Sequence, residues 1–330
     1  MSNKFKARAL ILTSTFIWGF SFPITRYALS YVDPVAFCGL RGLFGALVFL
    51  PVAMRLAHRG AGPGGSYGRE RPRLWLWAGM VSGLVLTLAT VFQYMGLSLT
   101  TSAKSGLLTG LYVTMVPLFG FVLGQLPPRT VWAGLFIGVV GLVLLSGAGG
   151  GDGFNRGDAL TLVGDLFWAL HVILMGHFAL KVNPWNYVAV QIVIMSVICL
   201  TFSYLIGTFP AFSAFMLVLP CSSYGVLSVA LAFLFQFKAQ KDVNPTEAAL
   251  LMQLQSVIAA IAGVLFLSER MTGWMWIGAF LMIVGSLVAQ RTCQTKMLLR
   301  GMPHFREYLY ARAAVAILVV SLCGVAVLVT

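Results

Sequence analysis

Two stretches of sequence decide the fold: residues 9–29, ALILTSTFIWGFSFPITRYAL, and residues 159–180, ALTLVGDLFWALHVILMGHFAL. Each is an apolar run of the length that an α-helix needs to cross the hydrocarbon core of a bilayer, about 20 residues. Both runs open with Ala-Leu, and both carry a tryptophan near the middle, Trp18 and Trp168. The pair predicts a membrane protein with an internal repeat.

The composition of the whole chain also favours a membrane protein. Only 9% of its 330 residues are charged and 59% are hydrophobic, whereas a soluble domain is about a quarter charged. The net charge of +13 is spread over short pieces between apolar runs and forms no basic face, so it does not predict nucleic-acid binding. The five cysteines lack CxxC spacing, and His171 and His177 do not share a helix face. No metal site or cofactor is therefore expected.

Apolar segments recur along the chain, and each is expected to be a helix because backbone polar groups in hydrocarbon must be bonded within their own segment. The expected helices cover residues 9–29, 34–53, 74–97, 102–123, 131–145, 159–180, 187–206, 214–237, 246–267, 274–289 and 313–329. The predicted domains are a first repeat at 1–148, a loop at 149–157, a second repeat at 158–290, and a basic connector with an extra hydrophobic helix at 291–330.

The repeat extends beyond the two opening stretches. A shift of 150 residues places Asp33-Pro34 on Asn183-Pro184, and a shift of 143 places Gln93 on Gln236 and Lys104 on Glu247. Five helices in each half are an odd number, so the second half enters the membrane from the opposite side. We expect an all-α polytopic membrane protein, a ten-helix bundle of two inverted five-helix repeats plus an eleventh C-terminal helix. Inverted repeats are a transporter architecture with the site near the midplane, although duplication could also simply enlarge a membrane scaffold.

The positions of the basic residues predict the orientation. If the N-terminus is cytoplasmic, seventeen of the 22 lysines and arginines fall on the inside. Cytoplasmic loops carry an excess of Lys and Arg. We therefore expect a multi-pass protein of the inner (plasma) membrane with a cytoplasmic N-terminus.

Several short motifs resemble one family of membrane proteins. They are IWGFSFP at 17–23, Asp33-Pro34, LRG at 40–42, TSA at 101–103, LTGLYV at 108–113, VPL at 116–118 and LSER at 267–270. Over roughly residues 7–290 the chain is similar to the EamA-type transporters of the drug/metabolite transporter superfamily. The resemblance implies ten helices with both termini cytoplasmic, and outward movement of metabolites, often amino acids or related solutes. The chain departs from the pattern at residues 125–128, where a Gly-Glu-Arg-like turn is expected, and at Asp165.

Polar and aromatic residues inside the expected helices are candidates for a central cavity, because a polar group at bilayer depth needs a partner or a wet cavity. The candidates are Trp18, Arg41, Gln93, Tyr112, Trp168, His171, Gln236 and Gln253. Arg41 fits a contact with an anion or a carboxylate, a pairing with Asp165, or bonds to helix carbonyls that fix packing. Packing alone also explains either tryptophan and His171.

Two ionisable residues are candidates for coupling transport to an ion. Asp165 lies well inside a helix and could carry a proton, or it could be held charged by Arg41 in a structural role. Lys104 is the second candidate, although its side chain could also extend outward to the interface. Pro23 and Pro117 lie inside expected helices and free backbone carbonyls, so they are candidate hinges or packing residues.

These features predict a secondary transporter of small organic metabolites such as amino acids. It is expected to need no ATP, because the sequence contains no GxxxxGK[ST] loop that would bind the nucleotide.

We expect this transporter to act as an exporter, by alternating access around a midplane cavity. The alternative is a non-transporting membrane scaffold or assembly partner that uses the C-terminal helix. An enzyme is not expected, because the chain lacks HExxH and paired acids at depth. The expected partners are a small-molecule solute and the lipid bilayer, and the sequence leaves open whether the protein works alone or as a homodimer.

Overall fold

The computed structural model describes residues 3–60, 72–122, 129–146, 153–243 and 245–290. All regular secondary structure in these residues is helical. They are α1 (Asn3–Ala28), α2 (Pro34–Gly60), α3 (Pro72–Leu99), α4 (Ser102–Thr109), α5 (Tyr112–Val122), α6 (Arg129–Ser146), α7 (Arg156–Phe178), α8 (Pro184–Leu205), α9 (Phe212–Ser223), the π-helix η1 (Val226–Leu231), α10 (Ala232–Ala239), α11 (Pro245–Met252), α12 (Leu254–Leu267) and α13 (Gly273–Gln290). The expected helix at 313–329 and its basic connector lie outside the described residues.

Most of these helices match the dimensions of a bilayer. Among the described residues, seven helical stretches are long and apolar enough to cross a membrane, and α6 and α13 contain shorter apolar helices. Large side chains such as Phe136, Phe212 and Phe280 are exposed along them. The all-helical, polytopic membrane class expected from the sequence is confirmed.

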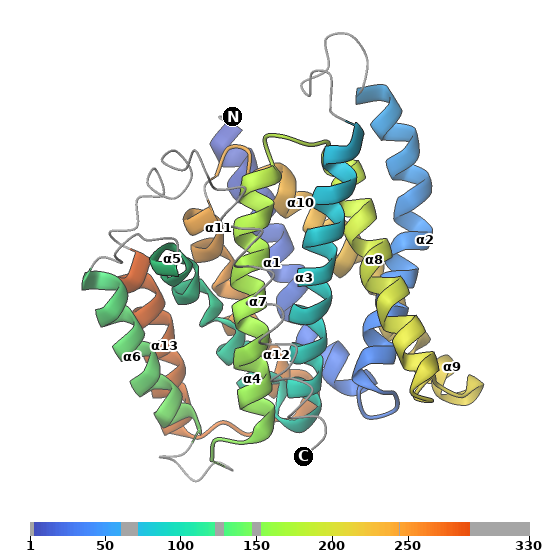
Figure 1. Cartoon of the computed structure of the whole chain (residues 1–330). Coiled ribbons are helices and arrows are strands. Elements are labelled where there is room, and N and C mark those ends of the chain that lie inside the picture. Colours follow the sequence, from blue (N-terminus) through green and yellow to red (C-terminus); the bar gives the residue numbers. More distant parts are fainter. Residues whose placement is uncertain (1–2, 61–71, 123–128, 147–152, 244, 291–330) are drawn as a thin grey trace.

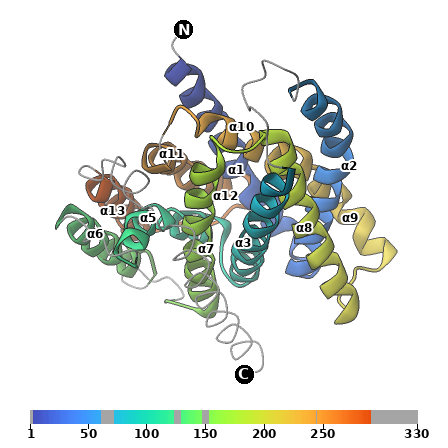
Figure 2. The same ribbon diagram turned by 45° about the horizontal axis from the view of Figure 1, so that its top comes forward.

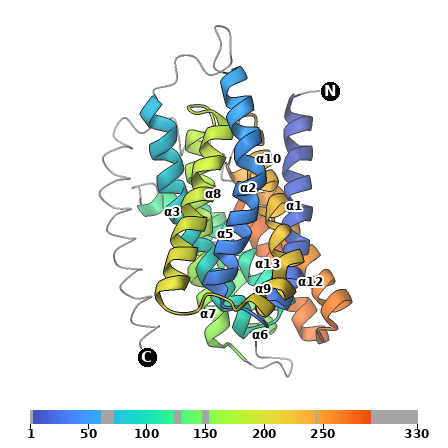
Figure 3. The same ribbon diagram turned by 90° about the vertical axis from the view of Figure 1, so that its right-hand side faces the viewer.

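The first helices of the two halves run in opposite directions. Figure 1 shows α1 starting at the end of the molecule that carries the N-terminus and α7 starting at the opposite end. In Figure 3 the start of α1, the end of α2 and the start of α3 lie together at one end. In Figure 2, α6 and α13 form one side of the bundle and α2, α8 and α9 the other, with α1, α3, α7 and α12 between them.

Glycines bring the corresponding helices of the two halves close together. On α2, Gly39 faces Leu200 of α8, and on α6, Gly141 faces the carbonyl of Gly278 on α13, where a Cβ would lie 2.6 Å from that oxygen. Small residues permit such a close approach of two backbones. In a bilayer the hydrophobic effect does not drive helices together, so helix association depends on van der Waals packing of this kind. Helix α2 therefore packs against α8, and α6 packs against α13.

Three of the expected helices are interrupted, which corrects the sequence prediction. The segment at 102–123 is divided into α4 and α5 at Gly110 and Leu111, the segment at 246–267 is divided into α11 and α12 at Gln253, and the segment at 214–237 contains η1. The first two interruptions meet. A Cβ on Gly110 would lie 2.6 Å from Gln253 Nε2, so the two breaks are in close contact. Hydropathy predicts the length of a span but not a break that a tertiary contact creates.

Candidate functional site

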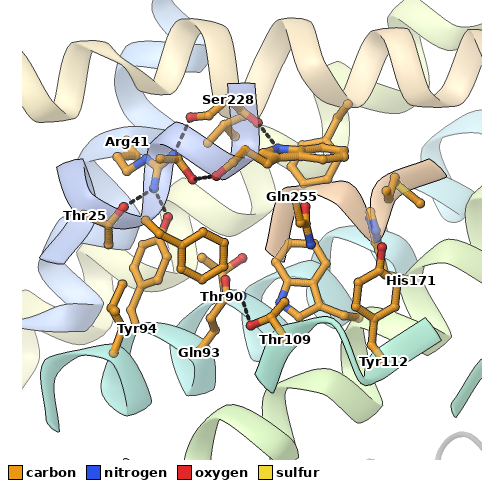
Figure 4. A pocket seen from close by; sticks show the side chains of 18 of the residues that line it. Thr25, Arg41, Thr90, Gln93, Tyr94, Thr109, Tyr112, His171, Ser228 and Gln255 are labelled. Carbon is orange, nitrogen blue, oxygen red and sulfur yellow. Dashed lines mark hydrogen bonds between the residues drawn. The ribbon is translucent and has the colours of Figure 1, made fainter. Parts of the chain in front are cut away.

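A cavity lies at the centre of the bundle, beside the interrupted helices. It holds about 710 Å³ of empty space, its open side included. Both halves contribute to its wall, through α1 to α5 on one side and α7, α8, η1 and α10 to α12 on the other. Figure 4 shows polar and aromatic side chains from these elements pointing toward one another around it.

Most of the residues predicted for a central cavity line this one. They are Trp18, Arg41, Gln93, Tyr112, Trp168, His171 and Gln236. Gln253 is the exception, because it lies at the break between α11 and α12 with its amide against Gly110. Gln255 lines the cavity instead. Side chains two residues apart in helical backbone point to nearly opposite faces, so Gln253 and Gln255 could not both line the cavity.

Arg41 on α2 is held in the wall by neutral groups. It is 3% exposed, and it donates from Nη1 to Thr25 Oγ1 at 2.8 Å, from Nη1 to the Tyr94 hydroxyl, and from Nη2 to Ser228 Oγ. Its guanidinium also lies 5.5 Å from the centroid of the Tyr94 ring. Nε has no partner among the described residues. The pairing of Arg41 with Asp165 that the sequence left open is absent here, since both carboxylate oxygens of Asp165 lack a hydrogen-bond partner in the described part of the chain.

The π-helix presents Ser228 to the site with two of its oxygens. Its hydroxyl accepts from Arg41 and donates to Tyr224 O at 3.0 Å, and its carbonyl accepts from Trp18 Nε1 at 2.8 Å. A π-turn widens the helix and commonly marks a functional position. Ser228 thus links the arginine side of the cavity to the aromatic side.

The aromatic side is a cluster of four rings on α1, α7 and α10. Phe233 is at its centre, with ring centroids 5.1 Å from Trp18, 6.1 Å from Trp168 and 5.4 Å from His171. His171 Nε2 bonds Gln191 Oε1 at 3.1 Å, whereas Trp168 Nε1 has no partner among the described residues. The two tryptophans matched across the repeat therefore meet at one ring.

Amides complete the polar wall. Gln93 donates to Thr109 Oγ1 at 2.9 Å. Its counterpart Gln236 is 1% exposed, and its Nε2 has no partner in the described part of the chain. No Asp or Glu is among the described residues that line the cavity. The wall thus combines one permanent cation with neutral hydrogen-bonding groups.

Comparison with known proteins identifies the family. The EamA-like transporter family matches twice, at residues 6–147 and 155–290. The chain belongs to the EamA-like transporter family. The motifs singled out in the sequence fall inside the two matches, and the family indicates a transporter rather than an enzyme.

Similar proteins are named as transporters too. An uncharacterized transporter of Archaeoglobus fulgidus is 26% identical over 82% of this chain and 82% of its own length. The uncharacterized inner membrane transporter YedA of Escherichia coli K12 is 22% identical over 79% of this chain and 83% of its own. One solved structure, titled only as a crystal structure of protein, matches with a TM-score of 0.60 at 21% identity, over 86% of this chain and 98% of that one, and shows the fold alone.

Lys104 of this EamA-like chain lies in an ion pair away from the cavity. Its Nζ is 2.6 Å from Asp158 Oδ2 and donates to Gly153 O at 2.7 Å, and the two charged side chains are 7% and 0% exposed. Asp158 also forms a capping box with Asn155 at the start of α7. The pair joins α4 to the start of α7.

A related ion pair lies at the corresponding place in the other half. Arg8 of α1 and Glu247 of α11 approach to 2.6 Å, with side chains 53% and 29% exposed. The shifts of 150 and 143 residues that define the repeat place Arg8 on Asp158 and Lys104 on Glu247, so the charges are reversed. The buried pair was not foreseen, although this sign reversal in the sequence could have revealed it.

The LSER motif of the EamA-like chain has a structural explanation. The carboxylate of Glu269 accepts from the backbone N–H of Ser102 at 2.6 Å and of Ala103 at 2.7 Å. A carboxylate at a helix N-terminus satisfies donors that have no partner within the helix and is favoured by the helix dipole. Glu269 of the second half therefore caps α4 of the first.

The remaining predicted residues take separate places. Asp165 is fully buried in α7 but does not line the cavity. Pro23 is buried inside α1, and Pro117 belongs to α5, although its side chain lies outside the described residues. In the part of the chain that the structure describes, no three His, Cys, Asp or Glu side chains form a group that could hold a metal ion. Thr25, Tyr94 and Ser228 were missed, because neutral hydroxyls inside apolar segments carry no distinctive pattern.

Proposed function

We propose that this protein is a secondary transporter that exports small organic metabolites, such as amino acids, by alternating access around the central cavity. The observation that carries the proposal is the position of the cavity, at the meeting point of interrupted helices from both halves. Broken helices at a midplane site are how transporters expose polar groups to a solute without facing them to lipid. The resemblance to the EamA-type transporters supports the proposed outward direction.

The mechanism that we propose uses two inverted halves of five passages each. The passages of the first half are α1, α2, α3, α4 with α5, and α6, and those of the second are α7, α8, α9 to α10, α11 with α12, and α13. The opposite directions of α1 and α7 and the pairing of α2 with α8 and of α6 with α13 support this division. Exchange of the two nearly equivalent shapes would open the cavity to each side in turn.

The first test is solute flux in vesicles that contain the purified full-length protein. Trp18→Ala and Trp168→Ala should each weaken apparent solute affinity, since both rings line the cavity. Trp274→Ala is the matched control, because Trp274 is 54% exposed at the start of α13. Unchanged affinity in both cavity variants would remove the cavity assignment.

Asp165 is proposed as the coupling group. Its two oxygens are buried without a hydrogen-bond partner among the described residues, which leaves the carboxyl free to gain or lose a proton as α7 moves. Asp165→Asn should abolish flux driven by a pH gradient and preserve solute exchange. Intact gradient-driven flux in this variant would rule the coupling role out.

Two further experiments test the topology and the scaffold alternative. A tag near Gly150 should be accessible from the side opposite to a tag at the N-terminus, and the N-terminal tag should be cytoplasmic. Truncation after Gln290 should leave solute flux intact if the ten passages transport by themselves. Loss of a partner interaction with no flux in either form would favour the scaffold.

A further inference from the structure

We propose that the solute of this cavity is an organic acid, whose carboxylate pairs with Arg41 and whose apolar body packs on the ring cluster of Trp18, Trp168 and Phe233. The inference rests on the proposed function, because it takes the cavity as the solute site. It adds a chemical class that the fold alone does not give.

Within the described part of the chain, no acidic side chain balances the charge of Arg41. Arginine stays protonated in proteins, and a buried charge is stable only when it is paired or fully hydrogen-bonded. The described wall supplies Arg41 with three hydroxyls and no carboxylate. Asp165, the acid that the sequence suggests as a partner for Arg41, forms no ion pair with it. The guanidinium therefore keeps both charge and donor capacity for an anion.

The cavity wall contains buried hydrogen-bond donors that have no partner among the described residues. Arg41 Nε and Trp168 Nε1 are buried without partners among the described residues, and neither side chain can act as an acceptor. Gln236 Nε2 is also buried without a partner among the described residues. The amide of Gln236 can turn over, so it can offer a donor or an acceptor at this place. A solute rich in acceptors satisfies such a wall, and a carboxylate is an acceptor on both of its oxygens.

The opposite side of the cavity selects an organic body rather than an inorganic ion. Phe233 lies within 6.1 Å, centroid to centroid, of both tryptophan rings, and Val229 and Met195 add apolar surface to the lining. Chloride or phosphate could not use this surface. Arg41 is also the one Lys or Arg in the described lining, which favours a single carboxylate over a phosphate ester with its greater charge.

The test uses the purified full-length protein in lipid nanodiscs and isothermal titration calorimetry. Three probes share one body and differ in the head group: 3-phenylpropanoate, 3-phenylpropanamide and 3-phenylpropylamine. We expect the acid to bind about 10- to 100-fold more tightly than the amide, the range for hydrogen bonds to a charged group, and the amine to bind most weakly. Acetate, which has the carboxylate without the body, should bind more weakly than the acid.

Variants then assign the preference to Arg41. In Arg41→Gln the acid and the amide should bind within about threefold of each other, since a single neutral hydrogen bond distinguishes them poorly. Arg26→Gln, a change on α1 outside the described lining, is the matched control and should keep the preference. If Arg41→Gln does not fold, the wild-type comparison of acid and amide still decides the proposal.

Each outcome counts for or against the inference. Equal binding of acid and amide, tighter binding of the amine, or no binding of any probe would overturn it, and acetate binding as tightly as the acid would overturn the role of the ring cluster. Counterflow in vesicles separates this inference from the proposed function. Flux of neutral solutes without preference for acids would refute the inference alone, whereas acid-selective binding without any flux would refute transport.

Discussion

Replacing Lys104 with methionine should destabilise the protein far more than the same change at Arg8, although the two residues form pseudo-equivalent ion pairs. Lys104 and Asp158 are 7% and 0% exposed, whereas Arg8 and Glu247 are 53% and 29% exposed. Loss of one partner of a buried pair costs about 3–5 kcal/mol, because the remaining charge stays in a poorly solvated place. Loss of an exposed pair costs about 0–1 kcal/mol.

The environment of Asp158 decides where the loss for Lys104→Met falls within the range of about 3–5 kcal/mol. After Lys104→Met its carboxylate would still accept from Asn155 N at 3.0 Å and from Thr100 Oγ1 at 3.2 Å. It also lies in the first turn of α7, where the helix dipole favours a negative charge. We therefore expect a loss of about 3 kcal/mol in the free energy of unfolding, at the lower end of the range.

The assay is equilibrium unfolding in mixed micelles of a mild detergent and dodecyl sulfate, followed by far-UV circular dichroism. The double variant Lys104→Met with Asp158→Asn removes both charges and should recover part of the loss, which a double-mutant cycle measures. Equal losses in Lys104→Met and Arg8→Met would refute the reasoning from burial. So would a double variant as unstable as the sum of its two single changes.

Three further predictions follow from contacts between the halves. Glu269→Gln should lower the free energy of unfolding by about 1–2 kcal/mol in the same assay, because it weakens the charge-assisted hydrogen bonds from Ser102 N and Ala103 N. An unchanged free energy of unfolding would contradict the capping role. Gly141→Ala should cost about 1–3 kcal/mol by pushing α6 from α13, whereas Gly273→Ala, with nothing within 4 Å of its new Cβ, should be neutral. Gly225→Ala would place a Cβ against the carbonyl oxygen of Arg41 and push α2 away. The variant should therefore bind the acid probe more weakly in calorimetry. Binding at the wild-type level would show that α2 can move without cost to the site.

The repeat is the reason that much of the candidate site could be predicted from sequence. Trp18 with Trp168 and Gln93 with Gln236 were selected because the same polar or aromatic type recurs at matched positions in apolar segments. In the proposed arrangement of two inverted halves, corresponding positions come together near the axis that relates the halves. All four residues line the cavity.

The remainder of the site depends on tertiary contacts that no local pattern encodes. The break at Gln253 turns that residue toward Gly110 and leaves Gln255 at the cavity, and the π-turn brings Ser228 to Arg41. Hydropathy alone treats both regions as continuous helices. Arg41 was recognised as costly at depth, but the hydroxyls that hold it could not be told from ordinary small residues of a helix interface.

The two ion pairs connect the repeat to the proposed alternation. Lys104 with Asp158 and Glu247 with Arg8 each join the fourth segment of one half to the first helix of the other, at opposite ends of the bundle. Two halves that can exchange shapes must differ in shape at any one moment, and the difference must be visible at equivalent contacts. The burial of one pair and the exposure of the other is such a difference. On the proposed mechanism, the buried pair closes the end of the bundle where α4 meets α7, and exchange requires that pair to become solvated while its counterpart is covered.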